Sequence, residues 1–169
     1  MSPVSDALAI AAVATATITA AAIDLRTRRV PNALTAGIAL VGVGMAASGL
    51  GRIGLLASVG GCLVGLALML PGHLLGATGG GDVKLLASVG TLLGPGATLR
   101  AFVATAIAGG LLAIFVAVRR GRLVATLAGT GALLKSAGSE MPDIRDTKHD
   151  NRFAYAPAIA VGAIVAALI

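Results

Sequence analysis

The sequence predicts an all-α, polytopic integral membrane protein with six transmembrane helices. Hydrophobic residues make up 57% of the 169 residues and charged residues only 12%, whereas a soluble domain is roughly half apolar and about a quarter charged. The apolar residues are gathered into runs, and basic residues separate the runs. Because this distribution is typical of membrane topology, the net charge of +6 does not indicate a nucleic-acid-binding surface.

The apolar runs give the expected transmembrane spans and one long loop within a single membrane-embedded domain, residues 1–169. The spans are expected at residues 4–23, 33–50, 53–75, 83–93, 97–118 and 153–169, with a loop at 119–152. A span needs ~20 apolar residues to cross the hydrocarbon core. The run at 83–93 rises only ~16 Å as a helix. We therefore expect this helix to be recessed into the bundle, with Asp82 at the foot of a water-filled notch.

Proline and glycine mark the expected breaks between the spans. Pro31 and Asn32 are typical of a helix start and follow a short basic loop. Pro71-Gly72 should kink or end the third span. Gly94-Pro95-Gly96 should end the fourth. The many Ala and Gly residues in the runs predict closely packed helices.

The basic residues predict which way the bundle faces. With six spans, the loops at 24–32, 76–82 and 119–152 share one side, and eleven of the thirteen Lys and Arg residues lie in or beside them. Arg52 and Arg100 lie on the other side. Since positive charge stays cytoplasmic, both termini are expected outside, and Asp24 and Asp82 are expected to share the cytoplasmic face.

Two aspartates stand apart from the other acids. Four of the seven acids lie in the polar stretch 139–150, and Asp6, in the first turn of a predicted helix, suits the helix macrodipole. Asp24 and Asp82 lie at the ends of apolar runs, where an acid is costly. Each has a structural explanation, because nearby arginines offer Asp24 partners and Asp82 is a helix-capping type.

Together the two aspartates suggest acid–base hydrolysis. Two carboxyl groups within hydrogen-bond reach share a proton. The ionised group takes a proton from water, which attacks a carbonyl, and the protonated group polarises that carbonyl. This chemistry requires no metal and no cofactor, and it predicts Asp24 and Asp82 as the catalytic pair.

The residues around Asp82 have two interpretations. Gly79, Gly80 and Gly81 would let the enzyme backbone run beside an extended peptide substrate, or they would form a simple turn. Lys84 would hold this active-site loop at the lipid headgroups, or contact substrate directly. We expect His73 to be a packed or interfacial residue rather than a ligand, and the single cysteine, Cys62, can form neither an internal disulfide nor a zinc cluster.

Three segments resemble motifs of the type IV prepilin peptidase family. Gly79-Gly80-Gly81-Asp82-Val83-Lys84-Leu85-Leu86 resembles its Gly-x-Gly-Asp motif, and Asp24 followed by Val30-Pro31-Asn32-Ala33-Leu34-Thr35 resembles its other aspartate motif. Residues 153–160 resemble its C-terminal segment, with Ala156 where the family usually has glycine. The resemblance implies a Gly-x-Gly-Asp aspartic protease bundle in which Asp24 and Asp82 are catalytic.

The same resemblance implies a substrate and a location. Family members are endopeptidases that cut the basic leader from prepilins after a glycine, at the cytoplasmic face of the membrane. Longer relatives carry paired cysteines in an extra N-terminal region and also methylate the new N-terminus. This chain is similar to the short, peptidase-only branch that serves Flp-type pili, so no methylation is expected of it. The expected partners are an Flp-type prepilin and membrane lipid, with no nucleic acid.

Other interpretations of the sequence remain open. Paired membrane aspartates also bind cations in small ion or solute transporters, and a non-catalytic pilus assembly factor is a third possibility. The stretch 139–150, with four acids against two bases, would attract a basic leader electrostatically, or it is a solvated loop.

Overall fold

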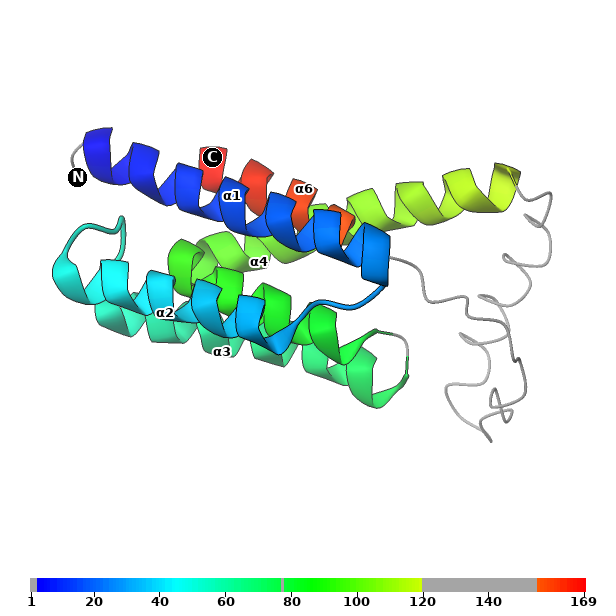
Figure 1. Cartoon of the computed structure of the whole chain (residues 1–169), viewed down its shortest axis with the longest axis horizontal. Coiled ribbons are helices and arrows are strands. Elements are labelled where there is room, and N and C mark those ends of the chain that lie inside the picture. Colours follow the sequence, from blue (N-terminus) through cyan, green and yellow to red (C-terminus); the bar gives the residue numbers. More distant parts are fainter. Residues whose placement is uncertain (1–2, 77, 120–154) are drawn as a thin grey trace. The chain divides into compact units, whose positions relative to one another are not determined.

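A computed structural model describes residues 3–76, 78–119 and 155–169, and every regular element within them is an α-helix (Figure 1). The helices are α1 (Pro3–Thr27), α2 (Asn32–Ser48), α3 (Leu55–Leu74), α4 (Gly80–Arg119) and α6 (Ala156–Leu168). The prediction of an all-α protein is therefore confirmed. Most of the predicted loop at 119–152, including the acidic stretch 139–150, lies outside the described residues.

The chain divides into two units, residues 1–109 with 153–169, and residues 110–152. All packing and all site geometry given below belong to the first, which we call the helical unit.

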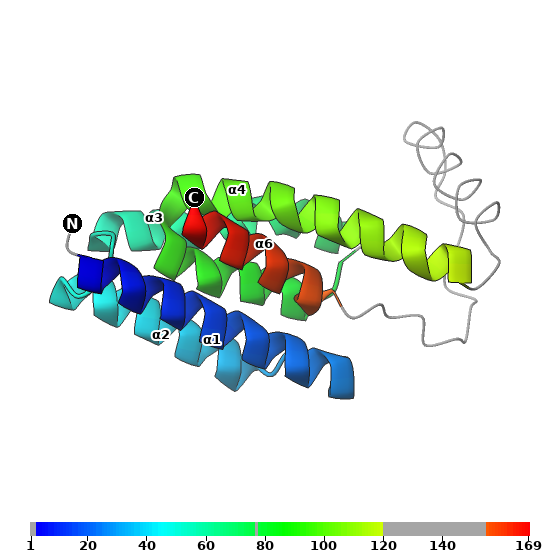
Figure 2. The ribbon, with the colours of Figure 1, turned by 90° about the horizontal axis from the view of Figure 1, so that it is seen from above.

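Helix α4 reverses direction at Gly94. The φ of Gly94 is 77° and its ψ is 172°, a combination open to glycine because it has no Cβ. Figures 1 and 2 both show α4 running along the bundle, turning and returning beside itself. We call residues 80–93 the first arm and residues 95–109, the rest of α4 within the helical unit, the second arm. The predicted break at Gly94-Pro95-Gly96 is thus confirmed, and it separates two antiparallel helical segments.

The third helix does not break at its proline. Helix α3 continues through Pro71 and ends at Leu74, where the N–H of Leu75 bonds the Pro71 carbonyl at 3.1 Å. The sequence placed a kink or an end at Pro71-Gly72, and the observed end falls within one turn of it.

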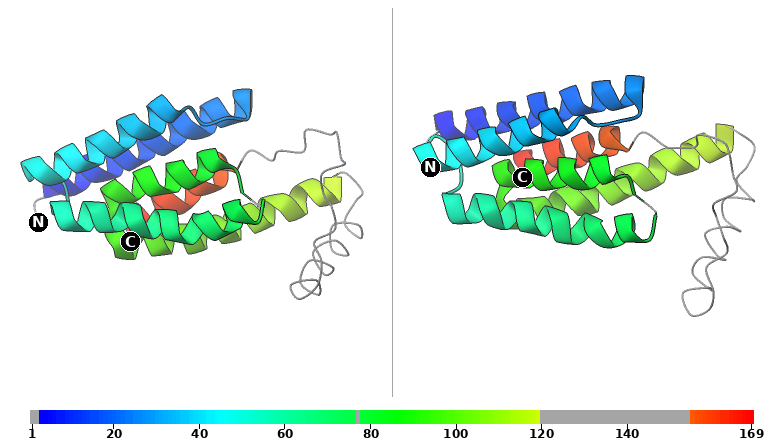
Figure 3. Two further views of the ribbon diagram at one scale, coloured as in Figure 1. Left: turned by 90° about the horizontal axis from the view of Figure 1, so that it is seen from below. Right: turned by 60° about the horizontal axis from the view of Figure 1, so that its bottom comes forward.

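The first arm of α4 is the core of the helical unit. Leu85, Leu86 and Val89 are fully buried, and Figure 3 shows this arm enclosed by the other helices of the unit. The apolar residues of this arm therefore contact protein, which explains how so short a run can be apolar on every side. This agrees with the expectation of a helix recessed into the bundle.

Glycines allow the closest helix contacts around this arm. Gly61 of α3 and Gly90 of the first arm face each other so closely that a Cβ on either would collide with the backbone of the other. Gly65 lies in the same way against Ala87. The small residues in the apolar runs therefore permit backbone-to-backbone packing, as the composition predicted.

Three described stretches are long and apolar enough to cross a membrane: Pro3–Thr27, Leu55–Leu74 and Gly80–Phe115. Helices α2 and α6 are apolar but have only 17 and 13 residues. Large aliphatic side chains cover the outside of the bundle, Leu56 being 91% exposed. The stretch Gly80–Phe115 includes the reversal at Gly94, so it is not one straight span. The expected number of six spans therefore stays a prediction.

Candidate active site

Asp24 lies in the last turn of α1 and is only 5% exposed. Its Oδ2 accepts a hydrogen bond of 3.2 Å from the backbone N–H of Ala156, the first residue of α6. The positive end of the α6 macrodipole therefore faces the carboxyl group. This contact explains how an acid is accommodated at the end of α1, where the macrodipole of its own helix opposes it. The sequence indicated only arginine partners.

Asp82 lies in the first turn of α4 and is partly buried. Its backbone N–H bonds the Gly79 carbonyl at 3.1 Å, so Asp82 is inside the helix rather than at the capping position considered from the sequence. Its carboxyl group interacts electrostatically with that of Asp24. The fold thus places the two predicted catalytic residues at the same end of the helical unit, although they are 58 positions apart in the chain.

The three glycines before Asp82 are largely helical. Gly80 and Gly81 form the start of α4, and only Gly79 precedes the helix. Of the three glycines expected to lie beside an extended peptide substrate, only Gly79 is therefore outside the helix. A Cβ on Gly79 would lie 3.1 Å from Oδ2 of Asp82, so a side chain at this position would crowd the carboxyl group.

The two aspartate motifs touch each other at two points. A Cβ on Gly81 would lie 3.3 Å from Cβ of Val30, so the absence of a side chain lets the loop after α1 approach the start of α4. On the exposed side, Nζ of Lys84 donates a hydrogen bond of 3.0 Å to Oδ1 of Asn32. Lys84 therefore ties the start of α4 to the start of α2, a contact that the sequence did not predict.

His73 lies in the last turn of α3, just before the loop that leads to α4. Its Nδ1 is 3.0 Å from the carbonyl oxygen of Thr78, and a Cβ on Gly80 would lie 3.4 Å from its Cε1. These contacts hold the connection between α3 and α4. His73 itself is exposed, so of the two roles expected from the sequence the packed one is wrong.

Tyr155 is a neighbour of the pair that the sequence did not single out. Its phenol interacts electrostatically with Asp82, and its ring lies against Gly109 of the second arm of α4. The only sequence signal was the family resemblance of residues 153–160, which marks the segment but not the residue. The start of α6 thus lies at the same end of the helical unit as the aspartates, with Tyr155 as the residue before the helix and Ala156 bonded to Asp24.

No group of three or more His, Cys, Asp or Glu side chains in the described part of the chain is placed to hold a metal ion. The chemistry that the visible side chains themselves offer is that of two neighbouring carboxyl groups. These groups lie where three helix ends meet: the end of α1 and the starts of α4 and α6.

Comparison with known proteins identifies the family. The model of the type IV leader peptidase family matches residues 11–114, a segment that contains both aspartates and more than half of the chain. Neither the curated proteins nor the solved structures searched contain a match to this chain. Since the family model covers most of the chain, including both aspartate motifs, the chain belongs to the type IV leader peptidase family.

Proposed function

We propose that the chain is an aspartic endopeptidase that removes the basic leader peptide of type IV prepilins, of the Flp type, after a glycine. The membership of a leader peptidase family supports a protease. The observation that carries the aspartic mechanism is the electrostatic interaction between Asp24 and Asp82 at one end of the bundle. Two carboxyl groups that come within hydrogen-bond reach of each other share a proton, which is the state that acid–base hydrolysis requires.

In the first step, the ionised carboxylate of the pair removes a proton from water. The oxygen of that water bonds to the scissile carbonyl carbon, and the protonated carboxyl group gives its proton to the carbonyl oxygen. The product is a tetrahedral diol, and the pair still holds one proton in total.

In the second step, the carboxyl group that received the proton gives it to the departing amide nitrogen, and the C–N bond breaks. The other carboxylate takes back a proton from the diol as the new acid forms. Because the pair exchanges one proton throughout, we treat the two groups as a unit and assign neither of them a fixed role.

The surrounding contacts fit the positioning that such a reaction needs. The N–H of Ala156 holds one oxygen of Asp24, and this fixes the orientation of the carboxyl group. The contact of Gly81 with Val30 and the Lys84–Asn32 hydrogen bond join the chain segments that follow Asp24 and Asp82. Catalytic groups must be held within about 0.5 Å of the productive geometry, and these contacts act on the segments that carry both groups.

The charge pattern supports a cytoplasmic site. Arg26, Arg28, Arg29 and Lys84 lie at the end of the bundle that holds the aspartates. Arg52 lies at the opposite end, where it contacts Asp6 near the start of α1 and the Ala167 carbonyl near the end of α6. By the positive-inside rule, the aspartates face the cytoplasm and both termini lie outside.

A cleavage assay with purified protein tests this function. The full chain in detergent is mixed with a prepilin peptide that carries its basic leader, and mass spectrometry identifies the products. We expect one cut after the glycine. Asp24→Asn and Asp82→Asn should each slow cleavage by about 10²–10⁴-fold while peptide binding is retained, and Arg29→Gln, which removes an exposed charge at the same end, should cleave normally.

Two measurements separate the alternatives. In the cleavage assay, failure of folded wild-type protein to cut the peptide would favour a transporter. In cells, normal pilus assembly by both Asn variants would instead indicate an assembly factor without catalysis.

A further inference from the structure

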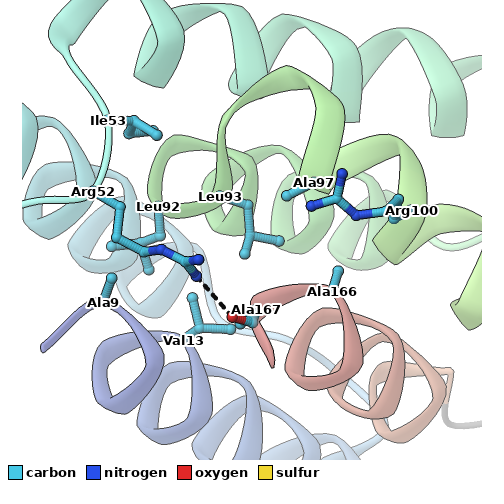
Figure 4. A pocket seen from close by; sticks show the side chains of 10 residues that line it. All are labelled: Ala9, Val13, Arg52, Ile53, Leu92, Leu93, Ala97, Arg100, Ala166 and Ala167. Carbon is cyan, nitrogen blue, oxygen red and sulfur yellow. Dashed lines mark hydrogen bonds between the residues drawn. The ribbon is translucent and has the colours of Figure 1, made fainter. Parts of the chain in front are cut away.

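A second polar cluster lies at the end of the bundle opposite the aspartates. A pocket of about 180 Å³ opens there between the starts of α1 and the second arm of α4, the loop before α3 and the end of α6 (Figure 4). Two of its lining residues are the arginines Arg52 and Arg100, and all the others are aliphatic: Ala9, Val13, Ile53, Leu92, Leu93, Ala97, Ala166 and Ala167. The pocket therefore combines two cationic side chains with an otherwise apolar lining.

The two arginines differ in their partners. Nε of Arg52 lies 3.1 Å from Oδ1 of Asp6, and its guanidinium also donates a hydrogen bond of 2.7 Å to the Ala167 carbonyl oxygen. Asp6 therefore balances the charge of Arg52. Arg100 forms no hydrogen bond or ion pair with another residue in the described part of the chain. The pocket thus carries about one uncompensated positive charge.

The side chain of Arg100 lies along the second arm of α4 and lines the pocket. A Cβ on Gly96 would lie 3.9 Å from a terminal nitrogen of Arg100, so the side chain extends back along the second arm toward the turn at Gly94. Figure 4 shows the two guanidinium groups reaching in from opposite sides, with Leu93 between them. Arg100 is exposed, so its guanidinium is open to a ligand, and guanidinium binds phosphate well because its planar fork matches the oxygens.

We propose that this pocket binds an anionic phospholipid, with the phosphate at Arg100 and Arg52 and an acyl chain along the aliphatic lining. A free phosphate would satisfy the arginines but would leave the apolar lining unused. Exposed aliphatic side chains cover the outside of the helical unit, and together with the apolar lining they favour a ligand that has both a charge and a chain. The site is separate from the aspartates and does not depend on the proposed catalysis.

Lipid-dependent thermal stability of the full chain in detergent tests the site. Phosphatidylglycerol should raise the unfolding temperature in a saturable manner, whereas zwitterionic phosphatidylcholine and inorganic phosphate should raise it much less. Arg100→Gln should weaken the phosphatidylglycerol dependence about tenfold or more, as expected when a charged hydrogen bond is lost. The matched control, Arg29→Gln, removes an exposed positive charge at the other end of the bundle and should respond as the wild type does.

A second variant tests the apolar half of the site. Ala97→Leu fills part of the lining while both arginines remain, and it should also lose the response to phosphatidylglycerol. Equal stabilisation by inorganic phosphate would show a simple anion site and overturn the lipid assignment. An unchanged response in Arg100→Gln, or equal responses to the two lipids, would overturn the site itself.

Discussion

At the scale of single residues, the surroundings of the two aspartates explain why an acid is tolerated at each position. Asp24 is buried and faces the N-terminus of α6, and Asp82 lies in the first turn of α4, where the macrodipole favours an acid. Neither residue therefore needs catalysis to account for its presence. The stability of each acid by itself does not explain why both acids lie at the end of the bundle where three helix ends meet.

Gly109 is the residue that best tests the surroundings of the pair. A Cβ on Gly109 would lie 2.6 Å from Cε2 of Tyr155, so Gly109→Ala must displace the ring that lies beside Asp82. We expect the rate of cleavage to fall about tenfold or more, because small displacements of positioning groups are costly to catalysis. The kcat and KM of purified protein measure the effect.

Gly110 supplies the control for this substitution. A Cβ there meets no described atom within 4 Å, and Gly110→Ala should therefore cleave at the wild-type rate. Equal losses in both variants would mean that helix composition, rather than the position of Tyr155, causes the effect.

At the scale of helices, the contact between α3 and the first arm of α4 depends on glycine. Gly61 and Gly90 bring the two backbones together, and next to them Oγ of Ser58 donates a hydrogen bond of 2.8 Å to the Thr91 carbonyl oxygen. Thr91 is four residues before Pro95, whose missing N–H cannot bond that carbonyl. The side chain of Ser58 therefore satisfies a buried carbonyl at the point where the first arm ends.

Adjacent glycines of α3 give a matched stability test. Gly61→Ala would force the helices apart, and we expect it to lower the free energy of unfolding by about 1–3 kcal/mol, the usual cost of overpacking. Gly60→Ala adds a methyl group that only reaches ordinary contact with Pro95, at 3.8 Å, and should be neutral or slightly stabilising. Thermal unfolding in detergent compares the two variants. Equal stability of Gly61→Ala and Gly60→Ala would contradict the close contact between α3 and the first arm of α4.

At the scale of the whole molecule, the sequence predicted the helices well and the neighbours of the site only in part. Apolar runs and prolines were sufficient to place α1, α2, α3, the reversal at Gly94 and α6. The burial of the first arm was predictable from its length, because a mainly apolar run of eleven residues is too short for a lipid-facing span. The ends and breaks of these helices are thus determined by residues at or near the same positions in the sequence.

Contacts between distant segments were not predictable in this way. The hydrogen bond from Ala156 to Asp24 joins residues 132 positions apart, and the bond from Lys84 to Asn32 joins residues 52 positions apart. Tyr155 carries no local pattern that marks it as a neighbour of Asp82. Such contacts follow from how the helices pack, which periodicity and composition do not specify.

Membrane orientation is a prediction for the whole molecule. In a background in which Cys62 is replaced by alanine, we expect Gly54→Cys, in the exposed loop before α3, to react with a membrane-impermeant thiol reagent on intact cells. Arg29→Cys, at the aspartate end, should react only after the membrane is permeabilised. The reverse pattern would place the aspartates outside and contradict the cytoplasmic site.

The central claim is that Asp24 and Asp82 act as one catalytic unit, and a double-variant comparison tests it most directly. The kcat/KM for a prepilin peptide is measured for the wild type, for Asp24→Asn, for Asp82→Asn and for the combined variant, all checked for folding. Groups that act as a unit are strongly non-additive, so we predict that each single change removes nearly all activity and that the combined variant is no slower. Near-normal cleavage by either single variant would contradict the account.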